Sequence, residues 1–81
     1  MYLSKDQKVE GIYMDGQKFT GKIINSRFVT TNNNVVEYFI QLDNHIKVFE
    51  HKHETIMLYV DFDGNSTYYT NFGKERIKPI N

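Results

Sequence analysis

The sequence contains no cysteine, no tryptophan, no alanine and a single proline. Without cysteine the chain has no disulfide, no thiolate nucleophile and no cysteine-ligated zinc site. Small secreted domains usually depend on disulfides, so this absence favours a cytoplasmic protein. Alanine is the strongest helix former, and its absence beside many Val, Ile, Thr, Tyr and Phe residues favours strands over helices.

Long apolar runs are missing as well. Residues 1–8 are mostly polar and lack the apolar core of a signal peptide, and no apolar stretch is long enough to span a bilayer. We therefore expect neither export nor membrane association.

The length of 81 residues fits one domain, close to the lower limit for an unaided hydrophobic core. We expect a single β domain over residues 1–81, with residues 1–7 and residue 81 loosely held. Most apolar side chains are needed for the core, which leaves little room for a deep active site. The sequence has no phosphate-binding glycine loop and no nucleophile elbow, so we expect no enzyme activity and no cofactor.

The commonest residues point to the origin of the chain. Asn, Lys and Ile occur eight times each, and Tyr and Phe six times each. Because all five are encoded by A/T-rich codons, we hypothesise a low-GC source and an accessory protein of a phage or mobile element.

Alternating apolar and polar residues predict an all-β fold of five or six antiparallel strands, forming either a strongly curved sheet or an SH3-like small barrel. The connection at residues 50–54 is polar, and Pro79 indicates an edge strand. Residues 45–49 can form a separate strand or prolong the preceding one past a bulge. The other expected strands cover residues 8–13, 18–30, 36–43, 55–62, 66–72 and 76–80.

Turn residues separate these strands. Asp15-Gly16 and Asp63-Gly64 are typical of hairpin turns, and residues 31–34 form an Asn-rich turn. Gly21 indicates a bend or bulge inside its strand.

The pairing register around the Asn-rich turn follows from its length. A three-residue loop at residues 32–34 places Phe28 opposite Tyr38 and Ile24 opposite Leu42, so that apolar residues face one another. We expect the next core strand to contribute a stripe of four apolar residues, namely Ile56, Leu58, Val60 and Phe62.

Three histidines lie close together in sequence. His51 and His53 point to one side of an extended chain, and His45 shares their phase. Imidazoles with this spacing can bind a metal, so a metal-binding protein is one alternative. A solvated histidine-rich connection is the other, and it is the interpretation we favour.

Several aromatic residues fall opposite the apolar stripe or near strand ends. Exposed rings on a β surface can anchor a protein partner or stack on bases, whereas strongly curved sheets also use both faces for the core. The candidate binding residues are Tyr13, Phe39, Tyr59, Phe62 and Tyr69.

The net charge is zero, but the charges are unevenly placed. Residues 31–63 are acidic, whereas the two ends of the chain are basic. If the terminal strands pair, their basic side chains can share a face that binds nucleic acid, although the zero net charge argues against strong phosphate binding. The residues of this basic face are Lys8, Lys18, Lys22, Arg27, Lys74, Arg76 and Lys78.

The segment at residues 59–65, followed by Arg76-Ile77-Lys78-Pro79-Ile80, resembles the C-terminal half of Tudor-like and other SH3-like small barrels. In those proteins a strand ends in an acidic-Gly turn and the closing strand ends in an apolar-x-Pro-apolar pattern. The resemblance covers about a quarter of the chain and implies the fold. It implies no ligand, because Asp63 meets Gly64 directly where methyl-reading Tudor domains often place an aromatic residue.

These observations predict a noncatalytic module that binds another protein. A nucleic-acid-binding barrel is the first alternative and a metal-binding protein is the second. The acidic middle of the chain favours a basic protein partner over phosphate. The sequence leaves the oligomeric state open, although a strand with an unpaired edge can pair with a copy of itself.

Overall fold

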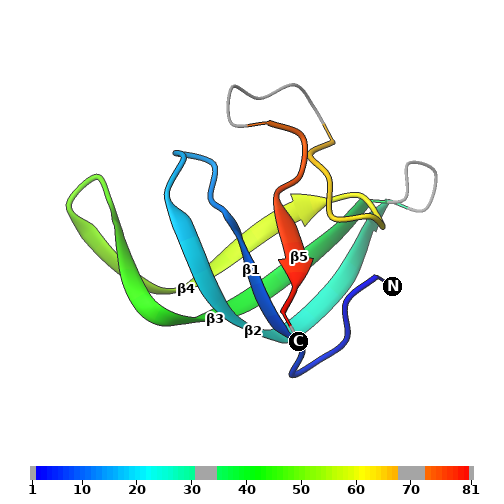
Figure 1. Ribbon diagram of the computed structural model, residues 1–81, viewed down its shortest axis with the longest axis horizontal. Coiled ribbons are helices and arrows are strands. Elements are labelled where there is room, and N and C mark those ends of the chain that lie inside the picture. The colour runs from blue at the N-terminus through cyan, green and yellow to red at the C-terminus, as the bar shows by residue number, and fades with distance from the viewer. Residues whose placement is uncertain (1, 31–34, 68–72, 81) are drawn as a thin grey trace.

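The computed structural model describes residues 2–30, 35–67 and 73–80, and it confirms the all-β prediction. One antiparallel sheet of five strands has the order β4-β3-β2-β1-β5 (Figure 1). None of the described segments forms a helix that could cross a membrane. The strands are β1 (Lys8–Ile12), β2 (Lys18–Thr30), β3 (Val35–Val48), β4 (His51–Val60) and β5 (Ile77–Pro79).

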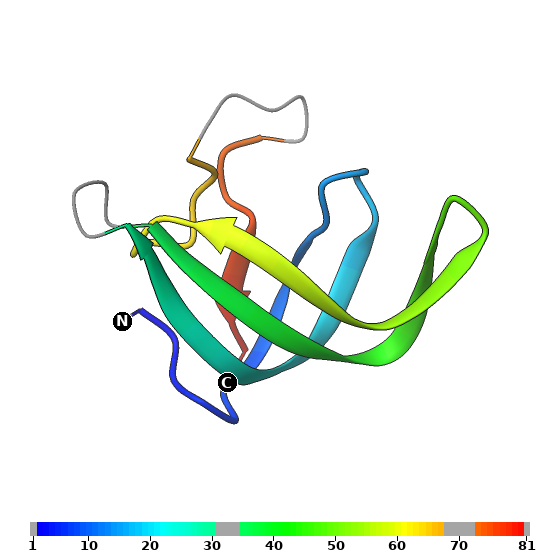
Figure 2. The same cartoon turned by 180° about the vertical axis from the view of Figure 1, so that it is seen from behind.

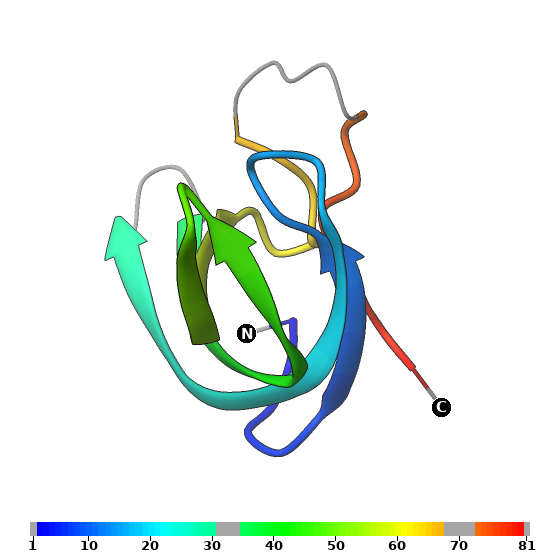
Figure 3. The same ribbon diagram turned by 90° about the vertical axis from the view of Figure 1, so that its left-hand side faces the viewer.

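The sheet curves strongly without closing into a barrel. The long strands β2 and β3 bend around the core, and Figures 2 and 3 show the curvature from behind and from the side. The edge strands β4 and β5 are not paired with each other in the described part of the chain. Two isolated bridges, Val60 to Ser66 and Asn65 to Glu75, join described residues that lie between the end of β4 and the start of β5.

The structure decides between the two interpretations of residues 45–49. β3 continues through them to Val48, with a register shift between Gln41 and Ile46, so the bulged extension is confirmed. The exposed connection predicted at residues 50–54 is wrong, because the turn consists of Phe49 and Glu50 alone. Both turn residues have positive φ, as the favoured two-residue hairpin turn requires.

The predicted register between β2 and β3 is also wrong. Phe28 pairs with Val36 and Ser26 with Tyr38, two residues away from the expected partners. A register shift between Ile23 and Asn25 then leaves Ile24 as an extra residue. This bulge exchanges the faces of β2, so Ile23 lies in the core where Ile24 was expected.

Gly21 lies close to this bulge, and its lack of a side chain allows the backbone of β3 to approach the backbone of β2 closely. A Cβ at this position would collide with the carbonyl oxygen of Gln41. Glycine therefore allows the sheet to bend here, as its position inside the strand predicts.

The core lies on the concave side of the sheet and is formed mainly by β2, β3 and β4. The N-terminal segment, which we expected to be loosely held, contributes Leu3, whose N–H donates to the Tyr38 hydroxyl at 2.8 Å. Backbone bonds from Asp6 and to Gln7 join this segment to Ile23 of β2. The core also contains Val9, Phe19, Ile23, Val36, Tyr38, Ile40, Leu42, Ile46, Ile56, Leu58, Val60 and Ile77.

The C-terminal strand forms the edge that Pro79 predicts, with Pro79 opposite Val9 of β1. Phe62 does not complete the predicted core stripe, because it follows the end of β4 and is partly exposed. The Asn-rich turn at residues 31–34 and most of the strand expected at 66–72 lie outside the described residues.

Candidate functional site

The outer, convex face of the sheet carries a cluster at one end of β2, β3 and β4. Glu37 of β3 lies between Arg27 of β2 and Tyr59 of β4, its direct cross-strand partners. Two residues further along β3, Phe39 pairs with Met57 of β4 on the same face. We call Arg27, Phe39, Met57 and Tyr59 the outer patch.

Glu37 is fully buried although it belongs to the outer face. A buried carboxylate is costly unless it is paired, and here Arg27 Nε donates to Glu37 Oε1 at 2.5 Å. The Arg27 side chain itself is 68% exposed, so it covers the carboxylate while remaining in contact with solvent.

The carboxylate also orders the aromatic side chains around it. The Arg27 guanidinium carbon lies 5.9 Å from the centre of the Phe39 ring, within cation–π range. Hydrogen bonding to Glu37 raises the pKa of Tyr59, because the Tyr59 hydroxyl is the donor and its ionised form would face the carboxylate. Within the outer patch, the buried acid thus contacts Arg27 and Tyr59 directly, and Phe39 is joined to it through Arg27.

The outer patch presents apolar and aromatic surface to solvent. Tyr59 is 44% exposed and Met57 is 46% exposed, at alternate positions of β4. Tyr, Met and Arg are the residue types enriched at protein interfaces. The Arg27 charge is already paired with Glu37, so the patch offers packing surface and hydrogen bonds with little net charge.

Among the described residues, the structure brings two of the predicted aromatic binding residues together, Phe39 and Tyr59. Tyr13 is half-buried and packs against the core. The Phe62 ring meets Phe28 in an edge-to-face contact with centroids 5.8 Å apart. Tyr69 lies outside the described residues.

The predicted basic face forms in part, because β1 does pair with both β2 and β5. Lys8 lies directly opposite Lys22, and Lys18 shares their face of the sheet. Lys78 is also there, but Glu10 lies opposite it and forms an ion pair at 3.3 Å. The remaining predicted members are elsewhere: Arg27 in the outer patch, Arg76 in the interior and Lys74 before β5.

The three histidines are distributed along the β3–β4 hairpin. His51 pairs with Val48 and His53 with Ile46, while His45 lies in the irregular part of β3. Within residues 2–30, 35–67 and 73–80, no group of three or more His, Asp or Glu side chains is placed to hold a metal ion. The geometry of the described residues therefore gives the metal-binding alternative no support.

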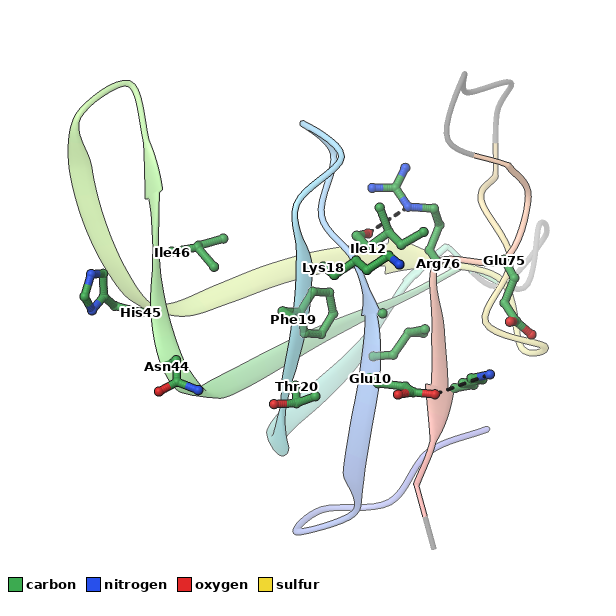
Figure 4. Close-up of a pocket in the computed structure, with 13 residues that line it drawn as sticks. Glu10, Ile12, Lys18, Phe19, Thr20, Asn44, His45, Ile46, Glu75 and Arg76 are labelled. Atoms are coloured by element: carbon green, nitrogen blue, oxygen red, sulfur yellow. Dashed lines mark hydrogen bonds and ion pairs between the residues drawn. The ribbon is translucent and has the colours of Figure 1, made fainter.

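A groove of about 550 Å³ begins where β2 and β3 part, beyond the pair of Gly21 and Leu42, and continues across β1 to the start of β5. Figure 4 shows Ile46 pointing from β3 toward β2, and His45 pointing the other way. Ile12 and Phe19 supply further apolar lining.

Arg76 lines this groove and is almost completely buried. Its Nε donates to the carbonyl oxygen of Ile12 at 2.9 Å (Figure 4). Its Nη2 is buried and makes no hydrogen bond to any described residue. A buried arginine places positive charge at this end of the groove. The sequence predicted Arg76 on an exposed basic face instead.

Sequence reasoning missed Glu37, Met57 and the position of Phe49. Glu37 reads as an ordinary solvent-facing residue, because its neighbours in sequence, Val36 and Tyr38, carry the apolar phase. Its burial depends on Arg27 and Tyr59, which the correct register places on either side of it. A charge pair across adjacent strands was the signal, and only the correct register reveals it.

Comparisons with known proteins give no relative from which a function could be transferred. No family model, no curated protein and no solved structure matches the chain.

Proposed function

We propose that the protein is a noncatalytic module that binds another protein through the outer patch. The observation that carries this proposal is the buried Glu37 between Arg27 and the exposed Tyr59, with the exposed Met57 on the same face of β4. A buried acid fixes the side chains above it before any partner arrives, and such preorganisation reduces the entropy lost on binding. Large rings held in this way are the usual anchors of protein interfaces.

The chemistry of the outer patch favours protein over nucleic acid. Phosphate recognition requires cations that are available to neutralise phosphates, whereas Arg27 is engaged with Glu37. Tyr59 and Met57 offer apolar surface with one hydroxyl, which suits the mixed apolar and polar core of a protein interface.

The resemblance to Tudor-like and SH3-like barrels remains part of the proposal. It is supported by the edge strand β5, which follows the Asp63-Gly64 turn and pairs with β1. A phage or mobile-element accessory protein that acts in the cytoplasm is the setting that the composition favours.

The proposal is tested by affinity capture from cells of the native host, with nuclease treatment as a control, followed by titration of the captured protein. Tyr59→Ala and Met57→Ala are each expected to weaken binding of the folded protein at least about tenfold. Met57→Ala should change the free energy of unfolding by less than about 1 kcal/mol. Tyr59→Ala should also lower the free energy of unfolding, because it removes a hydrogen-bond donor to the buried Glu37 carboxylate. Thr55→Ala is the matched control, because Thr55 lies on the same face of β4 and is exposed. Equal binding by all four proteins would refute the proposal.

Nucleic-acid binding is the second candidate function, favoured by the position of Lys8 directly opposite Lys22 with Lys18 on the same face. Like charges placed across adjacent strands are unfavourable in the free protein and become favourable beside phosphates. This candidate predicts that nuclease abolishes capture and that Lys22→Glu weakens binding more than Tyr59→Ala. It also predicts an affinity that falls steeply with salt concentration.

A further inference from the structure

At the tip of the β3–β4 hairpin, one residue combines a strained backbone conformation with an almost fully exposed aromatic side chain. Phe49 is 92% exposed and has φ of 51°, and the next residue, Glu50, has φ of 68°. Both values lie in the left-handed region, which is costly for residues with a Cβ and unusual for a bulky one. An Asn-Gly pair would form the same turn without this cost.

The same hairpin carries a second unfavourable feature. Lys47 and Lys52 lie directly opposite each other, one pair away from the Val48–His51 pair that closes the turn, and both are exposed. Like charges at this position destabilise a strand pair. The tip also projects away from the rest of the sheet (Figure 1), so its own chain does not cover the Phe49 ring. Local features that weaken the free fold are expected at functional sites.

The groove beside the base of this hairpin has the complementary properties. Its apolar lining comes from Ile12, Phe19 and Ile46, and its volume of about 550 Å³ is within the range of ordinary ligand sites. Lys18 and Arg76 line it, and neither forms an ion pair within the described part of the chain. The groove therefore suits an aromatic ring with a carboxylate beside it.

We propose that the Phe49-Glu50 tip of one copy of this chain occupies the groove of a second copy. The ring packs against Ile12 and Ile46, and the Glu50 carboxylate lies near Lys18 and Arg76. Glu75 at the groove is available to the lysines that flank the tip. Because tip and groove belong to the same hairpin region, a two-fold axis lets each copy fill the groove of the other, which produces a closed dimer. This inference is independent of the outer patch.

The direct test is the molecular mass of the whole chain as a function of concentration, measured by sedimentation and by light scattering up to about 1 mM. The wild type is expected to double its mass, and Phe49→Ala is expected to weaken the association at least about tenfold. Val29→Ala is the matched control, because Val29 is also an exposed apolar residue but belongs to β2 and does not line the groove. A wild type that stays at the mass of one copy over this range overturns the proposal, as does a Phe49→Ala variant that still dimerises like the wild type.

A charge exchange tests which surfaces meet. Glu50→Lys and Lys18→Glu each place like charges at the contact, so each variant alone is expected to be monomeric. Mixed in equal amounts they are expected to dimerise, because every tip then meets a groove of opposite charge. Both positions are exposed, so neither substitution changes the core, and circular dichroism checks that each variant is folded. No recovery in the mixture rejects the proposed contact.

Dilution of the wild type followed by NMR gives a test that needs no variant. The resonances of Phe49, Phe19 and Ile46 are expected to shift together with concentration, whereas those of Met57 and Tyr59 are expected to stay constant. If Met57 and Tyr59 shift instead, association occurs through the outer patch and the proposed tip contact is wrong.

Discussion

The two ends of the β3–β4 hairpin share one alternating pattern of residues but have different environments. At the end near Val36, β3 lies between β2 and β4, and residues 36–38 are buried on both faces of the sheet. At the other end β2 no longer pairs with β3 beyond the pair of Gly21 and Leu42, and β3 pairs with β4 alone. Of residues 43–54 only Ile46 is buried. Whether the side chains of this hairpin are buried therefore depends more on the presence of β2 beside β3 than on the alternation of apolar and polar residues.

Within this single hairpin, one end is stabilised by buried contacts and the other end is exposed to solvent. The packed end holds Tyr38 on the inner face and Glu37 on the outer face, each with a hydrogen-bond partner from another segment. The projecting end holds a strained turn, an exposed ring and two opposed lysines. The packed end can tolerate a buried acid, and the projecting end can tolerate strain, because each is supported by the same continuous strands.

The largest effect is expected in the core of the packed end. Leu58→Ala should lower the free energy of unfolding by about 2–5 kcal/mol, because Leu58 lies opposite Tyr38 and its truncation leaves a cavity. In a domain of this size that loss is a large fraction of the whole stability. Denaturant titration measures it, with Lys52→Ala at the projecting end of β4 as a control that should change stability by less than about 0.5 kcal/mol. Similar losses in the two variants would abolish the distinction between the ends.

The second effect concerns an exposed residue that should behave like a core residue. Arg27→Ala removes the charged partner of the buried Glu37 carboxylate and should cost about 1–3 kcal/mol. Lys47→Ala is the control, because Lys47 is also an exposed cation but faces another lysine across the hairpin. We expect this control to be neutral or slightly stabilising. A neutral Arg27→Ala would mean that water replaces the guanidinium at little cost, and the outer patch would lose its organising contact.

Most of the architecture could be predicted from the sequence, because strand positions depend on local alternation and on turn residues. The bounds of β2, the Asp15-Gly16 and Asp63-Gly64 turns and the edge position of Pro79 follow from that local information. The register between β2 and β3 does not, because Gly21 indicates a bend or bulge in β2 but not that the extra residue is Ile24.

The candidate site was less predictable for the same reason. Phe39 and Tyr59 were identified as aromatic residues opposite the apolar stripe, which alternation alone reveals. Glu37 became visible only when the register placed Arg27 and Tyr59 on either side of it. Phe49 was missed because the polar residues after it indicated a loop at 50–54, whereas a two-residue turn begins at Phe49 itself.

A smaller effect, of opposite sign, is expected at the projecting end. Glu50→Gly should raise the free energy of unfolding by about 0.5–1 kcal/mol. Glycine adopts the positive φ without the steric cost of a Cβ, and this gain exceeds the extra backbone entropy that glycine loses on folding. The measurement uses dilute protein, so that association does not contribute. His51→Gly, one residue later in the extended strand, should instead destabilise by a similar amount. Destabilisation by both substitutions would show that the turn is not strained in solution.

The last prediction concerns a difference in pH dependence at high pH, and it tests the inner face of the packed end. Burial raises the pKa of Tyr38 above the usual value of 10.0, because the phenolate would lose its hydration in the core. The unfolded chain then releases this proton at a lower pH than the folded chain does, so the folded state binds more protons once the pH passes about 10. The contribution of Tyr38 to the free energy of unfolding is therefore fully present below pH 10 and is lost as the pH rises through its folded pKa.

Tyr38→Phe should be less stable than the wild type at neutral pH by about 1 kcal/mol, since it loses the hydrogen bond from the Leu3 N–H. Above pH 10, however, the stability of this variant should fall less steeply than that of the wild type. Urea titrations of both proteins between pH 7 and pH 11 measure the two slopes, and equal slopes would show that the Tyr38 hydroxyl remains accessible to water.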